Sequence, residues 1–207
     1  LTEAANTVGA QWVGAQPQKG GANAAQMLAG GLKAVLLLNN EPVFDSAAGA
    51  AAAQALGQAE MVVTLSPFKA NLEFSDVLLP IAPFTETPGT FVNAEGRVQS
   101  FHAVVKPLGE TRPAWKVLRV LANLLGLQGF TYESTADVLA AAGVSGNVPA
   151  DKLSNEAVAN AAQAAQGEPV VASIYQLDSI VRRAPSLQLT ADARRAPEVA
   201  SREEALA

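Results

Sequence analysis

Three short apolar runs divide the first eighty residues at regular intervals, namely residues 33–38, 61–65 and 77–79. Unbroken apolar runs of this length are typical of strands that are covered on both faces, as in a parallel sheet. Asn23 is placed to cap a helix before the first run, and Asp45 or Ser46 to cap one that ends at Gly57. This alternation predicts an α/β fold, a parallel-sheet, Rossmann-like unit with right-handed crossovers.

A β-hairpin is predicted directly after the third run, over residues 90–101. Asn93 suits the first position of a four-residue turn because its side chain can bond the backbone that follows it. Gly96 suits the position that needs a left-handed backbone. Glu95 and Arg97 flank this glycine, and we expect them to form a local ion pair.

Helices are predicted for most of the remaining chain. One begins at Thr111 or Arg112, has Pro113 in its first turn and ends before Gly126, and we expect its apolar face to pack on the sheet. Beyond residue 129 the sequence is rich in alanine and predicts helices over 135–142, over 155–166, and from 172 or 178 to 184, stopped near Pro185. The last fifteen residues fit a solvated helix or a frayed tail equally well. We therefore divide the chain into an α/β domain, residues 1–130, and an alanine-rich helical C-terminal extension, residues 131–207.

Composition narrows the chemistry that the chain can perform. The 207 residues carry a net charge of −5 with no basic stripe, which argues against a nucleic-acid partner. Cysteine is absent and His102 is the single histidine, so iron–sulfur clusters, thiolate zinc sites and a catalytic triad are not expected. The longest apolar run is far shorter than the ~20 residues that a membrane span needs, so we expect no membrane insertion.

The first predicted strand is followed by Asn39, Asn40, Glu41 and Pro42 rather than by glycines. Phosphate binding at such a turn needs backbone N–H donors. Glu41 would repel a phosphate and Pro42 removes a donor, so binding of NAD in the usual manner is not expected.

Several acidic residues could serve as catalytic carboxylates. Glu86 and Glu95 are the most obvious pair, and Glu41, Asp45 and Asp76 lie near predicted strand ends, where open α/β sheets bind ligands. Neither histidine nor lysine is placed to tune these groups, so we expect structural roles and predict no catalytic residue and no metal ligand.

Arg182 and Arg183 close a predicted helix near the C-terminus. Cations are favourable at this end of a helix because of its dipole. Docking of both guanidinium groups on carboxylates of a neighbouring subunit is the alternative.

One segment, residues 75–99, carries a long and specific string of residues. It reads SDVLLPIAPFTETPGTFVNAEGRVQ, and it resembles the molybdopterin oxidoreductase superfamily. The matching positions are Asp76, Leu79, Pro80, Glu86, Gly89, Thr90, Phe91, Asn93, Glu95, Gly96, Arg97 and Gln99. Within the superfamily, three further segments (residues 5–10, 109–115 and 175–184) are similar to the large iron–sulfur subunit of bacterial respiratory complex I, the NADH:quinone oxidoreductase.

The resemblance implies a structural and assembly domain of the electron-transfer arm, without a redox centre of its own. In that family the iron–sulfur clusters lie in a preceding N-terminal part, so we expect this chain to be a fragment without cofactor. The implied partners are other subunits of the peripheral arm of complex I, on the cytoplasmic side of the bacterial inner membrane.

An alternative from the same resemblance is the late portion of a catalytic molybdopterin enzyme of the formate dehydrogenase or nitrate reductase type. The residues near a bound pterin dinucleotide would then be Glu86, Gly89, Thr90, Asn93, Glu95, Gly96 and Arg97. Such enzymes continue into a β-rich domain after this motif, whereas this chain continues into alanine-rich helical sequence. We therefore expect the assembly function and no cofactor-binding residue.

Overall fold

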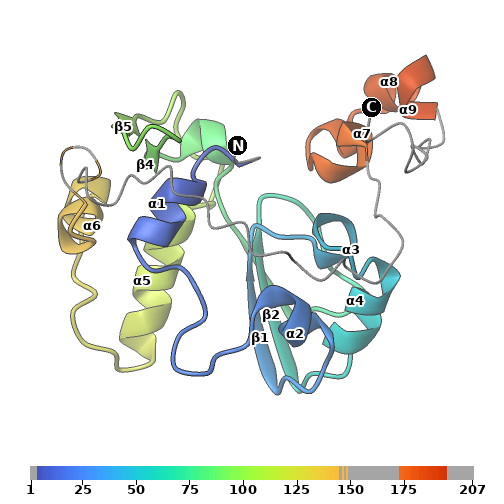
Figure 1. The fold of residues 1–207 in the computed structure, drawn as a ribbon, viewed down its shortest axis with the longest axis horizontal. Coiled ribbons are helices and arrows are strands. Elements are labelled where there is room, and N and C mark those ends of the chain that lie inside the picture. Colours follow the sequence, from blue (N-terminus) through green and yellow to red (C-terminus); the bar gives the residue numbers. More distant parts are fainter. Residues whose placement is uncertain (1–3, 145, 147, 149–172, 195–207) are drawn as a thin grey trace, which may run out of the picture.

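The computed structural model describes residues 4–144, 146, 148 and 173–194. Its centre is a three-stranded parallel sheet of β1 (Ala34–Leu38), β2 (Met61–Ser66) and β3 (Val77–Pro80), in the order β1-β2-β3. The register pairs Ala34 with Met61 and Val63 with Val77. A two-stranded antiparallel hairpin and helices complete the mixed α/β fold, so the predicted fold class is confirmed (Figure 1).

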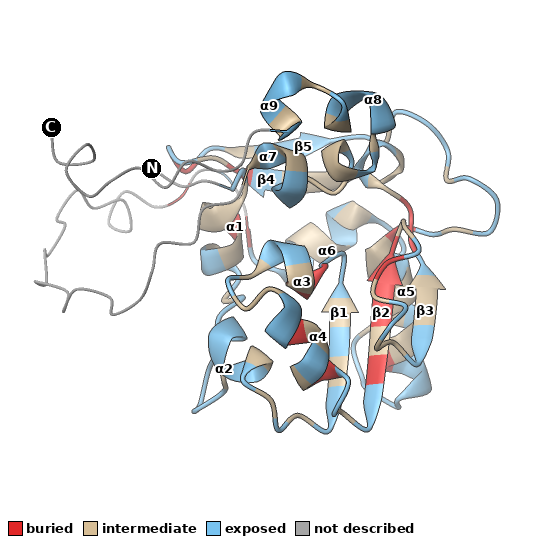
Figure 2. Ribbon diagram, turned by 90° about the vertical axis from the view of Figure 1, so that its right-hand side faces the viewer, coloured by how far each residue is buried: buried red, intermediate tan, exposed pale blue. Residues whose placement is uncertain are grey.

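Three short helices pack on one face of the sheet. They are α2 (Ala24–Leu28), α3 (Pro42–Asp45) and α4 (Ala50–Leu56). Asn23 caps α2 as expected, in a capping box with Gln26. The predicted helix start at Asp45 or Ser46 is wrong, because Asp45 ends α3 and Gly49 precedes α4. Ala52 and Leu56 of α4 and Val62 of β2 form part of the buried core (Figure 2).

Cover on both faces is confirmed for the central strand β2, whose Thr64 and Leu65 point to opposite faces and are both buried, but it is wrong for β1. Leu36 and Leu38 of β1 are each 46% exposed. Figure 1 shows α3 and α4 on one side of the sheet and α5 (Ala114–Leu124) on the other. α5 therefore lies on the side of the sheet where it was expected, but it leaves Leu36 and Leu38 of β1 half-exposed. An apolar run indicates that its side chains favour burial. Whether another element packs against them depends on residues elsewhere in the chain.

The hairpin consists of β4 (Gly89–Val92) and β5 (Val98–Phe101), close to the predicted bounds. The Oδ1 atom of Asn93 accepts hydrogen bonds from the backbone N–H groups of Glu95, at 3.1 Å, and Arg97, at 2.9 Å. Gly96 has φ +79°, the left-handed conformation that we predicted. No ion pair joins Glu95 and Arg97 in the part of the chain that the structure describes, so that expectation is wrong.

Two helices, one before and one after the hairpin in the sequence, pack beside it. They are α1 (Thr7–Trp12) and α6 (Thr135–Ala141), and α6 begins at a capping box formed by Ser134 and Asp137. The Oδ1 atom of Asn6 accepts a hydrogen bond from the backbone N–H of Val92 at 2.8 Å, which joins α1 to β4. A small apolar cluster fills the space between these elements. Its members are Val92, Val144 and Val148, with Val8, Trp12, Val98 and Leu139 packed around them.

The C-terminal segment, residues 173–194, forms short helical turns instead of one helix to residue 184. These are α7 (Ile174–Leu177), η3 (Val181–Arg183), α8 (Pro185–Gln188) and α9 (Ala191–Arg194). Pro185 starts α8 at its first position, where a missing N–H is harmless, rather than only ending the preceding helix. Figures 1 and 2 show this segment above the carboxyl ends of the strands, with α7 near α3. The predicted helix over 155–166 lies outside the described residues.

None of the helices described is long and apolar enough to cross a bilayer.

Candidate functional site

The carboxyl edge of the parallel sheet is where open α/β folds bind ligands. Here Glu41 follows β1 and precedes α3, and its side chain is only 9% exposed. Its backbone N–H donates to Oδ2 of Asp45 at 2.7 Å, which ties the first turn of α3 together. Among the predicted carboxylates, Glu41 and Asp45 therefore lie together at this edge.

Two arginines from the C-terminal segment bind the Glu41 carboxylate from above. The Nη2 atom of Arg182 lies 2.8 Å from Oε1, and the Nη2 atom of Arg183 donates to Oε2 at 2.8 Å. The Arg182 contact is an ion pair whose N–H directions miss good hydrogen-bond geometry. A further, longer contact of 3.5 Å joins Nη1 of Arg182 to Oδ1 of Asp45. Each oxygen of the Glu41 carboxylate thus has its own cation.

Both guanidinium groups make further contacts beside the carboxylate. Arg182 donates from Nη1 to the backbone carbonyls of Gln176 and Leu177, each at 2.9 Å. Its guanidinium carbon lies 4.6 Å from the ring centroid of Phe44, and that of Arg183 lies 4.2 Å from that of Phe68. These contacts hold both cations over the sheet edge.

The charges in this group balance, because two carboxylates, Glu41 and Asp45, face two guanidinium groups, Arg182 and Arg183. Burial raises the pKa of Glu41, but the hydrogen bonds and charges of Arg183 and Arg182 together outweigh it and leave the pKa below its ordinary value. The carboxylate is therefore ionised at neutral pH. It is held as a counterion and is not tuned as a general acid or base.

The two sequence-based interpretations of Arg182 and Arg183 need correction. Both side chains bind carboxylates, as the docking alternative requires, but these carboxylates belong to the same chain. Both cations do lie in the last turn of a short helix, the 3-10 helix η3, but the helix carbonyls that Arg182 contacts are those at the end of α7. Asp76 is not part of this site. Its Oδ2 accepts from the Val62 N–H at 2.6 Å where β3 begins, at the opposite edge of the sheet.

The candidate pterin residues lie along the hairpin and are engaged in its own structure. Thr90 Oγ1 hydrogen bonds Ser100 Oγ at 2.9 Å, and Oε2 of Glu86 accepts from the backbone N–H of Leu108 at 3.0 Å. A Cβ at Gly89 would lie 2.8 Å from the Phe101 ring, so any larger residue here would have to displace that ring. Glu86 precedes β4 and Glu95 follows it, so the length of a strand separates the two carboxylates.

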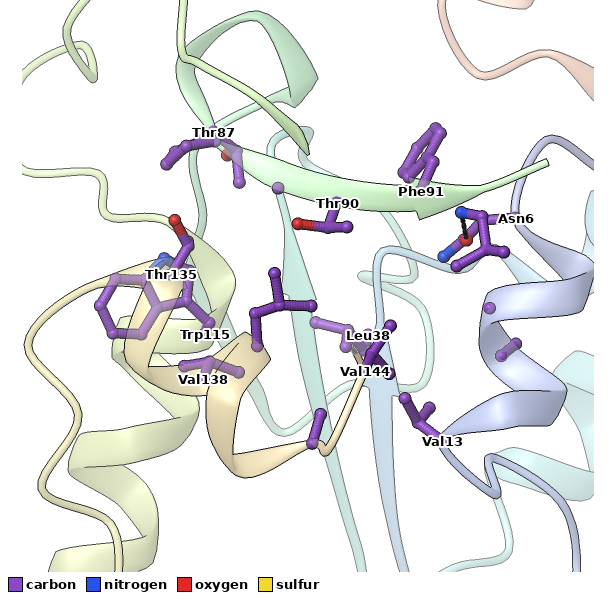
Figure 3. Close-up of a pocket in the computed structure, with 17 residues that line it drawn as sticks. Asn6, Val13, Leu38, Thr87, Thr90, Phe91, Trp115, Thr135, Val138 and Val144 are labelled. Atoms are coloured by element: carbon purple, nitrogen blue, oxygen red, sulfur yellow. Dashed lines mark hydrogen bonds between the residues drawn. The ribbon is translucent and has the colours of Figure 1, made fainter. Parts of the chain in front are cut away.

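An apolar cavity of about 550 Å³ lies between the hairpin and the neighbouring helices (Figure 3). Thr90 and Phe91 of β4, Trp115 of α5, Val138 of α6 and Leu38 of β1 contribute to its wall. The Nε1 atom of Trp115 is buried and has no hydrogen-bond partner among the residues that the structure describes. The wall also includes the polar residues Asn6, Thr87, Thr90 and Thr135, but it has no charged side chain among the described residues that line it.

Comparison with known proteins assigns the family. The sequence profile of the molybdopterin oxidoreductase family matches residues 1–124. The chain belongs to this family. Similar curated proteins include "Probable oxidoreductase YjgC" of Bacillus subtilis strain 168, which is 46% identical over 67 residues. "Putative formate dehydrogenase SAB2186c" of Staphylococcus aureus strain bovine RF122 / ET3-1 is 41% identical over 66 residues. Each match covers 32% of this chain and 7% of the relative's length.

A molybdopterin dinucleotide carries a diphosphate, so the carboxyl edge can be tested for its fit to this family's cofactor. Binding would require free N–H donors or unpaired cations at the end of β1. Glu41 places a negative charge there, and Pro42 lacks a donor. The two nearby guanidinium groups are already neutralised within the chain. The residues at this edge therefore do not fit a diphosphate group.

Sequence reasoning identified Glu41, Arg182 and Arg183 separately but did not predict that they bind one another. They lie about 140 residues apart, and 142 separate Glu41 from Arg183. Their opposite charges were a signal, but several acidic residues were equally plausible partners. Phe44 and Phe68 gave no separate signal of a cation contact, because aromatic side chains near strand ends usually belong to the core.

Proposed function

We propose that this chain is a structural and assembly part of a respiratory oxidoreductase subunit, of the kind found in the electron-transfer arm of complex I, and that it holds no redox centre. The observation that supports the proposal is the closed carboxyl edge, where Arg182 and Arg183 neutralise Glu41. The edge at which open α/β sheets bind ligands is used here to attach the C-terminal segment. The partners would be neighbouring subunits of the peripheral arm, on the cytoplasmic side of the bacterial inner membrane.

A second candidate is part of a catalytic molybdopterin enzyme, and the relatives' names favour it. Several similar proteins carry the name "Putative formate dehydrogenase", and two of them are 41% and 36% identical to this chain over 66 residues. Those matches cover only 7% of each relative, so they support membership of the family more strongly than they support a formate dehydrogenase activity. The ion pairs of Glu41 with Arg182 and Arg183 at the carboxyl edge of the sheet favour the assembly function for this chain.

Purification of the full-length parent protein from the cells that make it would separate the two candidates. With a mild detergent and an affinity tag, the assembly function predicts co-purifying subunits and electron transfer from NADH to a quinone. The catalytic candidate predicts reduction of a dye by formate or a related small substrate. Formate-dependent dye reduction without NADH:quinone activity would refute the proposal.

A further inference from the structure

The Glu41–Arg182–Arg183 cluster has the geometry of a bound ligand rather than of an ordinary surface ion pair. Two guanidinium groups surround one carboxylate and contact different oxygens, each at 2.8 Å. The side chains of Glu41 and Arg182 are 9% and 8% exposed, so the interaction is largely removed from water. Paired guanidinium groups of this kind are a common means by which proteins bind carboxylates and phosphates.

The two guanidinium groups are positioned by contacts that do not involve Glu41. Carbonyls of α7 and the Phe44 ring hold Arg182. The Ser179 carbonyl, at 3.0 Å, and the Phe68 ring hold Arg183. A binding group that is fixed in advance loses little entropy when its ligand arrives. Removal of the carboxylate would therefore leave two oriented cations facing a small space.

Arg182 also retains binding capacity. Its Nε atom is buried and lacks a hydrogen-bond partner within the described part of the chain. A buried guanidinium N–H without a partner is costly, and a tetrahedral oxyanion has more acceptor positions than a carboxylate. Arg183 is 31% exposed, which gives an anion from solution a route to the pair.

We propose that Glu41 determines ligand specificity at this edge, because its carboxylate is the resident ligand of an oxyanion-binding site formed by Arg182 and Arg183 and thereby excludes phosphate-bearing ligands. The inference deepens the proposed function and rests on it, since it names the residue that keeps a nucleotide cofactor out. A ligand tethered to the same chain has a high effective concentration, on the order of millimolar or more, and outcompetes a weak free anion.

The test uses the 207-residue chain and sodium diphosphate as the probe, with sodium chloride at equal ionic strength as the salt control. Binding is measured by titration calorimetry for the wild type, Glu41→Gln and Glu41→Ala. We expect no saturable binding to the wild type, and saturable binding to Glu41→Ala with a Kd on the order of 1 mM or tighter. Acetate should bind the same variant more weakly.

Two controls make the result specific. Glu110→Ala removes a carboxylate from an exposed ion pair, with Arg112, and should gain no binding. A triple variant with Glu41→Ala, Arg182→Gln and Arg183→Gln should lose the binding that Glu41→Ala gains. Hydrogen exchange of residues 174–184 is measured in parallel. We expect Glu41→Ala to lose part of the protection there, because the contacts of Arg182 and Arg183 with the Phe44 and Phe68 rings remain, and we expect diphosphate to restore it.

Several results would overturn the inference. One is saturable binding of diphosphate to the wild type with the affinity of the variant, and another is binding that persists in the triple variant. A third is that hydrogen exchange in residues 174–184 of Glu41→Ala is not slowed by saturating diphosphate. The anion would then fail to replace the carboxylate. Molybdenum in the parent protein would contradict the proposed function but would leave a gain of anion binding in Glu41→Ala unchanged.

Discussion

Replacement of Glu41 by glutamine tests how strongly the C-terminal segment is attached to the sheet. The change keeps the side-chain volume but removes the charge that two guanidinium groups contact at 2.8 Å. Removal of one partner from a fully buried ion pair costs about 3–5 kcal/mol, because the remaining charge stays buried and unpaired. Arg182 is 8% exposed but Arg183 is 31% exposed, so water compensates part of the loss. We expect a loss of about 3 kcal/mol in the free energy of unfolding of this segment.

The assay combines urea unfolding with hydrogen exchange of the amides in residues 174–184. Exchange measures local opening, and it separates detachment of the C-terminal segment from unfolding of the sheet. The matched control is Glu110→Gln, which breaks an ion pair of 3.4 Å whose side chains are 53% and 96% exposed. Exposed pairs of this kind contribute about 0–1 kcal/mol.

Equal effects of Glu41→Gln and Glu110→Gln on exchange in residues 174–184 would refute the reasoning. Such a result would mean that the segment is held by other contacts, or that it does not rest on the sheet. Loss of protection in the sheet alone would also contradict it.

The remaining predictions concern pH and the hairpin. The pKa of Glu41 lies below its ordinary value of 4.5. The ionised carboxylate therefore contributes its full stabilisation above that pH, and the contribution is lost as the pH falls through the lower folded-state pKa. The difference in unfolding free energy between wild type and Glu41→Gln should shrink only in that acid range. Gly96→Ala should cost about 1 kcal/mol in thermal unfolding, since Gly96 has φ +79°. Gly89→Ala should lower the free energy of unfolding by about 1–3 kcal/mol, because its Cβ would lie 2.8 Å from the Phe101 ring. The loss should be markedly smaller in a Phe101→Ala background. An equal loss in both backgrounds would contradict the packing argument. Asn93→Ala should cost about 1–2 kcal/mol through the loss of two hydrogen bonds to the turn backbone, and an unchanged Tm would contradict this.

Local sequence signals predicted most of the secondary structure. Asn23, Asn93 and Gly96 each act through their own backbone neighbourhood, so their roles follow from a few adjacent residues. The three parallel strands also followed from their apolar runs, because each run is too short for a buried helix.

The errors arose where a residue depends on a distant part of the chain. The apolar run of β1 predicted cover on both faces, yet Leu36 and Leu38 remain half-exposed, since no local pattern reveals what packs against a face. The partners of Arg182 and Arg183 could not be predicted for the same reason. Pro185 was expected to end a helix, but proline is equally suited to begin one, and the sequence alone does not distinguish these positions.

In our proposal, the carboxyl edge of this chain is closed by its own residues and holds no pterin dinucleotide. The most direct measurement is the molybdenum and pterin content of the full-length parent protein, by elemental mass spectrometry and by fluorescence of the acid-released, oxidised pterin. Our account predicts iron from its clusters but neither molybdenum nor pterin above background. A stoichiometric amount of both in the active protein would contradict it.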